Sequence, residues 1–101
     1  MSGVNISVII PSYNRIGLLE QCLRSILKQT YPMVNVEIIV VDDACLDAVF
    51  NLIKMFDCPN IIYLKGERRG PASARNIAAM RAKGEILAFI DDDCSADEYW
   101  L

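Results

Sequence analysis

Histidine is absent from this chain of 101 residues, and its absence removes several kinds of chemistry at once. Ser-His and Cys-His nucleophilic mechanisms and His-ligated metal sites all require it. The four cysteines are widely spaced and form no C-x-x-C pair, which argues against a structural zinc site. We therefore interpret the cysteines as reduced, mostly buried thiols, and expect any chemistry to use carboxylates, Arg, Lys, Tyr or Ser.

The chain also lacks an excess of positive charge and a long apolar run. Ten basic residues against thirteen acidic ones give a net charge of −3, so nothing favours a nucleic-acid partner or an anionic membrane. No apolar run approaches the ~18 residues of a membrane span, and no signal-peptide pattern is present. We expect a cytoplasmic protein with no membrane span in this chain, although the full-length protein could lie peripherally at the inner face of the membrane.

Hydrophobic residues make up 53% of the chain, which indicates one small domain with a substantial core. Short apolar runs alternate with stretches of helical periodicity, in the order β-α-β-α-β-α-β. The pattern predicts strands at residues 6–10, 36–41, 61–64 and 86–90, and helices at about 15–29, from 47 onward, and 71–83.

Four residues with strong local preferences predict where these elements begin and end. Pro11 is expected to end the first strand, because proline cannot donate a backbone hydrogen bond. Asp47 is expected to cap the start of the second helix. Pro71 is placed at the first position of the third helix, and Gly84 at its C-terminal stop.

This order predicts an α/β fold, a three-layer sandwich with a mostly parallel sheet of strand order 3-2-1-4. Near-continuous apolar strands indicate burial on both faces. The order puts a topological switch point between the first and fourth strands, where open α/β sheets bind ligands. Polar residues meet there: residues 12–14, 42–43 and 91–93 follow three of the strands, and the other strand leads to Gly70 and Arg75.

Three consecutive aspartates, Asp91, Asp92 and Asp93, directly follow the last apolar run. Like charges this close repel one another, so the cluster favours a bound cation. Mg²⁺ and Mn²⁺ prefer oxygen ligands and can bridge a carboxylate to a phosphate. We therefore predict a divalent metal site here; the alternative is a solvated acidic loop.

Several segments together resemble the family 2 glycosyltransferases of the GT-A fold. They occur in the family's order and cover nearly the whole chain. One stretch departs from the pattern, because Ala44 and Cys45 stand where the family commonly has Gly-Ser. The resembling segments are SVIIPSYNR at 7–15, SILKQTYP at 25–32, EIIVVDD at 37–43, GPASARN at 70–76, AKGE at 82–85 and FIDDD at 89–93.

The resemblance implies the Rossmann-like half of a GT-A fold, a single nucleotide-sugar-binding domain over residues 1–101. We expect it to be the N-terminal part of a longer enzyme. The implied reaction is inverting transfer of a sugar from a nucleotide-diphospho-sugar, most readily a UDP-sugar, to a hydroxyl of a saccharide or lipid-linked acceptor. The general base of the family lies downstream of this chain, so no catalytic residue is assigned and the chain alone is expected to be inactive.

The resemblance also implies roles on the diphosphate side of the site. Asp93 and Asp91 would hold Mn²⁺ or Mg²⁺, and Asp92 would approach the ribose, or the metal through water. Arg75 would reach the base or diphosphate, although it could instead pair with an aspartate. Gly70 would permit close backbone approach, although glycine before a helix is also ordinary turn chemistry.

On the base side, the resemblance implies that Tyr13 stacks on the nucleobase and that Asp43 accepts a base N–H. Pro11 and Ser12 would shape the turn and offer backbone groups. An ordinary half-buried tyrosine is the alternative for Tyr13. For Asp43 and its neighbour Asp42 the alternative is that both cap the following helix.

Two other functions stay open at this point. A nucleotidyltransferase also uses an α/β sheet and acidic metal ligands, but it would more often carry a Gly-rich basic loop after the first strand. An inactive binding or interaction module could keep the fold alone, but it would be free to lose the aspartates and Arg75. Arg68 and Arg69 are interpreted as solvated, with phosphate contact the lesser alternative.

Overall fold

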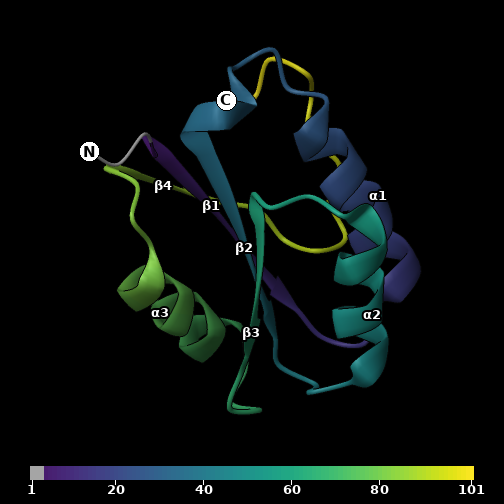
Figure 1. The fold of residues 1–101 in the computed structure, drawn as a ribbon. Coiled ribbons are helices and arrows are strands. Elements are labelled where there is room, and N and C mark those ends of the chain that lie inside the picture. Colours follow the sequence, from purple (N-terminus) through teal and green to yellow (C-terminus); the bar gives the residue numbers. More distant parts are fainter. Residues whose placement is uncertain (1–3) are drawn as a thin grey trace.

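Parallel β-strands form the centre of the computed structural model, which describes residues 4–101 (Figure 1). Strand β1 lies between β2 and β4, giving the order β3-β2-β1-β4 with every pairing parallel. The predicted order is confirmed. The elements are β1 (Ile6–Ser12), α1 (Ile16–Leu27), the 3₁₀ turn η1 (Met33–Asn35), β2 (Val36–Asp42), α2 (Asp47–Phe56), β3 (Ile61–Lys65), α3 (Pro71–Arg81) and β4 (Ile86–Phe89).

Helices cover both faces of the sheet, with α1 and α2 on one side and α3 on the other (Figure 1). Alternate residues of a strand face opposite sides, so each strand contributes to two cores. Val8 and Ile10 of β1 lie in the larger core beneath α1 and α2. Ile9 packs with Ala74 and Ala78 of α3, whose small side chains let that helix lie close to the sheet. The predicted three layers are confirmed.

The strands differ in burial. All seven residues of β1 and of β2 are buried, as predicted from their apolar runs. In β4, however, Ile86 is 59% exposed and Phe89 is 47% exposed. The prediction of burial on both faces is wrong for β4, because this strand lies at the edge of the described sheet and pairs with β1 alone.

Strand β1 does not end at Pro11, as predicted, but continues to Ser12. The carbonyl of Ile9 accepts from Ile90 N–H on the β4 side, and that of Ser12 accepts from Asp43 N–H on the β2 side. Successive residues of a strand bond to opposite neighbours, so the Pro11 nitrogen faces the β4 side. Pairing with β4 has already ended there, which is why proline costs the sheet nothing.

Two predicted helix limits are also wrong. Leu46 occupies the N-cap position of α2, and Asp47 is the first helical residue. Helix α3 ends at Arg81 and is followed by Ala82 in an extended conformation, so it does not continue to a left-handed Gly84. Glycine is needed at position 84 because a Cβ there would lie 2.6 Å from the backbone nitrogen of Ser7.

The connections place the carboxyl ends of all four strands at one edge of the sheet. Helices α1, α2 and α3 each return the chain to the opposite edge before the next strand begins, as parallel strands require. Within residues 4–101, none of the helices has the length and apolar character needed to cross a membrane.

Candidate functional site

A cleft of about 540 Å³ opens at the carboxyl edge of the sheet, at the switch point between β1 and β4. This volume is in the range of small-molecule sites. The nine residues predicted for the site all line it, together with three others. The lining residues are Pro11, Ser12, Tyr13, Arg15, Asp43, Arg68, Gly70, Pro71, Arg75, Asp91, Asp92 and Asp93.

The end of β1 presents an aromatic ring to the cleft. Ser12 is buried, whereas the next side chain, Tyr13, is 62% exposed. Asn14 then takes a left-handed conformation with φ of 53°, which turns the chain into α1. Tyr13 is therefore more exposed than an ordinary half-buried tyrosine, and its ring is accessible for stacking.

The first carboxylate after β2 supports its own loop. Asp42 is fully buried, and its side chain accepts hydrogen bonds from Cys45 N–H (3.0 Å), Leu46 N–H (2.8 Å) and the Tyr63 hydroxyl (2.8 Å). Burial and the bond to Asp42 raise the pKa of Tyr63, so its hydroxyl remains a donor. These bonds hold the loop that leads to α2, and the N-cap of that helix, Leu46, has no side-chain cap hydrogen bond.

The second carboxylate, Asp43, shapes the loop opposite. It is 4% exposed, with Oδ1 accepting from Arg68 N–H and Oδ2 from Gly70 N–H, each at 2.9 Å. Arg68 and Gly70 have positive φ of 59° and 94°, and a Cβ at Gly66 would lie 2.9 Å from Asp43 Cα. Each carboxylate oxygen has a further lone pair, so Asp43 can also accept from a ligand in the cleft.

The departure at Ala44 and Cys45 leaves this arrangement intact. Cys45 has a positive φ of 56°, whereas Ala44 is not among the described residues with positive φ. The freedom of a glycine is therefore not required at position 44. The Cys45 thiol lies 3.5 Å from the carbonyl of Gly66, so the substituted residue still links the two loops at this edge.

Asp92 joins the ends of β1 and β4. It is 5% exposed, and its carboxylate accepts from Tyr13 N–H (3.2 Å) and lies 3.4 Å from Arg15 Nη1. Burial is the main influence on the pKa of Asp92 and raises it, and the negative charge of Asp93 raises this pKa further. The Tyr13 N–H and the Arg15 guanidinium lower it. Asp92 is thus buried and bonded to a backbone N–H, whereas its two neighbours are exposed.

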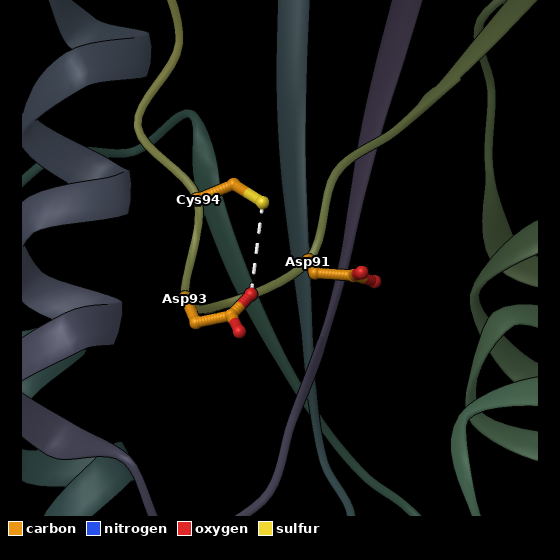
Figure 2. A group of neighbouring side chains, drawn as sticks. All are labelled: Asp91, Asp93 and Cys94. Atoms are coloured by element: carbon orange, nitrogen blue, oxygen red, sulfur yellow. Dashed lines mark hydrogen bonds between the residues drawn. The ribbon is translucent and has the colours of Figure 1, made fainter.

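Asp91, Asp93 and Cys94 form an exposed group on the turn after β4 (Figure 2). One ligand atom from each lies within 4.8 Å of the others, and the Cys94 thiol is 3.6 Å from Asp93 Oδ1. Carboxylate oxygens suit Mg²⁺ and Mn²⁺. The donor set therefore fits a hard divalent cation held by Asp91 and Asp93, with a softer thiol beside it.

Two arginines neutralise these carboxylates. Arg75 lies 3.2 Å from Asp91, and Arg15 lies 3.2 Å from Asp93. Pairing with an aspartate is the alternative role that the sequence left open for Arg75. No site role was predicted for Arg15 or for Cys94. Their signals were positional: Arg15 closes the S-Y-N-R turn after the first strand, and Cys94 directly follows the aspartates.

The model of the family described as "Glycosyl transferase family 2" matches residues 7–101. The chain belongs to this family. It is 37% identical to "Glycosyltransferase AglE" of Haloferax volcanii, over 95% of this chain and 33% of that protein. The family and the GT-A fold predicted from the sequence are confirmed.

Two solved structures are similar to this glycosyl transferase family 2 chain. S. aureus TarS 1-349 in complex with UDP-GlcNAc has a TM-score of 0.85 and 31% identity, over 94% of this chain and 28% of that one. Mannosyltransferase PcManGT from Pyrobaculum calidifontis, in complex with GDP-Man and Mn²⁺, has a TM-score of 0.81 and 34% identity, over 90% and 28%. The chain spans about a third or less of each relative.

Proposed function

We propose that the cleft binds a nucleotide-diphospho-sugar and a divalent metal, as the donor site of an inverting glycosyltransferase. The observation that carries the proposal is the convergence of nine predicted residues on one cleft. The sugar would pass to a hydroxyl of a saccharide or lipid-linked acceptor. UDP is the first candidate nucleotide because TarS was solved with UDP-GlcNAc, and GDP is the second because PcManGT was solved with GDP-Man.

In this proposal the base lies between Tyr13 and Asp43. The exposed ring of Tyr13 supplies a stacking surface that tolerates any base. Asp43 supplies an acceptor for a base N–H, held in place by its bonds to Arg68 and Gly70. Pro11 and Ser12 also line the cleft and would offer backbone groups, and Gly70 would give a ligand close access to the backbone.

At the other end of the cleft, Asp91 and Asp93 would hold the metal, and Asp92 would fix the turn that carries them. A bound divalent cation would neutralise negative charge on the departing diphosphate. Arg15 and Arg75 already lie against the two carboxylates, and their planar guanidinium groups are suited to phosphate oxygens. A ligand phosphate would draw them from the aspartates.

The acceptor hydroxyl must lose a proton to a general base. Asp91 and Asp93 are poor candidates, since a metal-bound carboxylate is a weak base. We therefore place the base outside residues 1–101, and propose that this chain is the N-terminal donor-binding part of a longer, cytoplasmic enzyme. The purified 101-residue chain is then expected to bind donor without measurable sugar transfer.

A thermal-shift series with UDP, GDP and TDP, each with and without Mn²⁺, tests the donor site. A ligand that binds only the folded state at 100 times its Kd stabilises it by about 2.7 kcal/mol. We expect the largest shift with UDP and Mn²⁺ together, and a reduced shift in Tyr13→Ala. If no nucleotide raises the melting temperature in the presence of Mn²⁺, the proposal is wrong.

A further inference from the structure

One stripe of α1 contacts the chain that follows the aspartates. We call residues 91–101 the acidic loop, and Cys22, Ser25 and Gln29 the α1 stripe. The spacing of three and then four residues puts the stripe on one face of the helix and of the turn just beyond its end. This face points at the acidic loop and does not line the nucleotide cleft.

The first two members of the stripe reach the beginning and middle of the loop. The Cys22 thiol lies 3.6 Å from the carbonyl of Asp91, and the Ser25 hydroxyl accepts from Ala96 N–H at 2.9 Å. Ser25 in turn donates to the carbonyl of Cys22 at 2.6 Å. The bond to Cys22 therefore orients the Ser25 hydroxyl so that its oxygen can accept from Ala96 N–H.

Gln29 holds the end of the loop with both ends of its amide. Its Nε2 donates to the carbonyl of Asp97 at 2.5 Å, and its Oε1 accepts from Leu101 N–H at 2.8 Å. The backbone N–H of Thr30 adds a bond to the carbonyl of Glu98 at 2.9 Å. Gln29 is 7% exposed, and a buried amide with both ends bonded has one orientation.

The acidic loop has no helix or strand of its own to fix its course. Many of the hydrogen bonds of its backbone are made with the α1 stripe. Earlier residues of the stripe bond to earlier residues of the loop, and later residues to later ones. An exposed carboxylate on an unsupported loop would have to be ordered when a cation binds, at a cost in entropy. Loop residues that carry function are commonly held by a rigid scaffold, and here that scaffold is α1.

We infer that Ser25 and Gln29 are positioning residues, which hold the acidic loop so that Asp91 and Asp93 present their carboxylates together. This inference rests on the proposed function, because it assigns the metal to these two aspartates. Neither Ser25 nor Gln29 would touch donor or metal. A purely structural role would differ: removing the bonds would lower stability but leave the metal affinity of the folded protein unchanged.

The test compares Gln29→Met with Gln21→Met. Methionine is close to glutamine in size and removes the amide, and Gln21 is an exposed residue of the same helix. Free Mn²⁺ is measured by electron paramagnetic resonance with UDP present, and metal-free UDP binding by calorimetry, at a temperature where each variant is folded. We expect Gln29→Met to weaken Mn²⁺ binding about tenfold, as for other groups that orient metal ligands.

Metal-free UDP affinity should be unchanged in Gln29→Met, because Tyr13 and Asp43 lie on other loops. Gln21→Met should match the wild type in both measurements. If Gln29→Met does not fold, Ser25→Ala replaces it: this variant loses the bond to Ala96 N–H, and Ser25→Thr, which keeps a hydroxyl, should restore Mn²⁺ affinity.

Hydrogen exchange gives a second measurement that needs no ligand. The amides of residues 93–96 should exchange at least about tenfold faster in Gln29→Met than in Gln21→Met, since local opening becomes easier. Equal Mn²⁺ affinity of wild type and Gln29→Met would overturn the positioning role and leave the proposed function standing. Absence of Mn²⁺ binding in the wild type would overturn both.

Discussion

The carboxylates that end β2 and those that end β4 look alike in the sequence but have different surroundings. Asp42 and Asp43 are 0% and 4% exposed. Backbone N–H groups donate to both, from its own loop for Asp42 and from the loop before α3 for Asp43. Asp91 and Asp93 are exposed, and among the described residues their ion pairs are with Arg75 and Arg15. The same residue type therefore serves two purposes at one edge of the sheet.

The partners explain the difference. A backbone N–H is fixed in place, so a buried carboxylate bonded to it becomes part of the scaffold and is costly to remove. An arginine side chain in water gains little from an ion pair and can move away when a better partner binds. Asp92 belongs with the scaffold, since it is buried and accepts from Tyr13 N–H. The triplet thus combines one structural carboxylate with two that are available to a ligand.

Removing a scaffold carboxylate should have the largest effect on stability. Asp42→Ala leaves two backbone N–H groups and the Tyr63 hydroxyl without their acceptor, so we expect the free energy of unfolding to fall by about 3 kcal/mol. Urea denaturation measures the change. The control is Asp47→Ala, an exposed aspartate in the first turn of α2. If Asp42→Ala and Asp47→Ala have equal free energies of unfolding, Asp42 is not a scaffold carboxylate.

Glu37 extends the comparison to the opposite edge of the sheet. This carboxylate is 5% exposed and accepts from the Ser7 hydroxyl (2.5 Å) and from Lys83 N–H (2.6 Å). We expect Glu37→Gln to lower the free energy of unfolding by about 1–2 kcal/mol, because both bonds are accepted by the same oxygen, Oε2, and both lose their charge-assisted strength. The exposed Glu85→Gln is the matched control.

The nucleotide-induced thermal shift of Glu37→Gln should equal that of the wild type. Glu37 lies at the start of β2, far along the strand from Asp43, so it can weaken the fold without changing the cleft. A lost nucleotide shift in a folded Glu37→Gln protein would mean that scaffold and site are coupled across the sheet.

The smallest effect on stability is expected for Asp93→Ala. Its carboxylate is exposed and its contacts are an arginine in solvent and a thiol, so the urea midpoint should stay at the wild-type value. The Mn²⁺ dependence of nucleotide binding should nevertheless disappear. Glu98→Ala removes a charge of the same sign from the same loop and should keep that dependence. Persistence of the Mn²⁺ effect in Asp93→Ala would refute the role of this residue.

Much of the fold could be predicted because the signals were local and repeated. Four apolar runs separated by helical periods favour parallel strands. The wrong predictions concern the burial of the edge strand β4 and a few single residues. Pro11 stays in β1 because β4 pairing stops short of it, and Gly84 is required by the backbone of Ser7. Each of these errors depends on a neighbour distant in sequence, which a local preference cannot reveal.

The membership of the cleft could be predicted for a similar reason. The carboxyl ends of parallel strands must share one edge, so polar residues after each strand converge there. What each residue contacts could not be predicted. Arg15 was assigned no role, yet it lies against Asp92 and Asp93, which come from the other end of the chain.

The sequence by itself determined the order of elements, the strand order, the family and most of the residues at the cleft, because periodicity, turn residues and motifs are written along the chain. Only the tertiary structure decided which carboxylates are scaffold and which are available, and that α1 holds the acidic loop. Burial and hydrogen bonding depend on atoms from other elements: Gln29 meets Leu101 across 72 positions of sequence. That contact exists only once the helix and the loop have packed together.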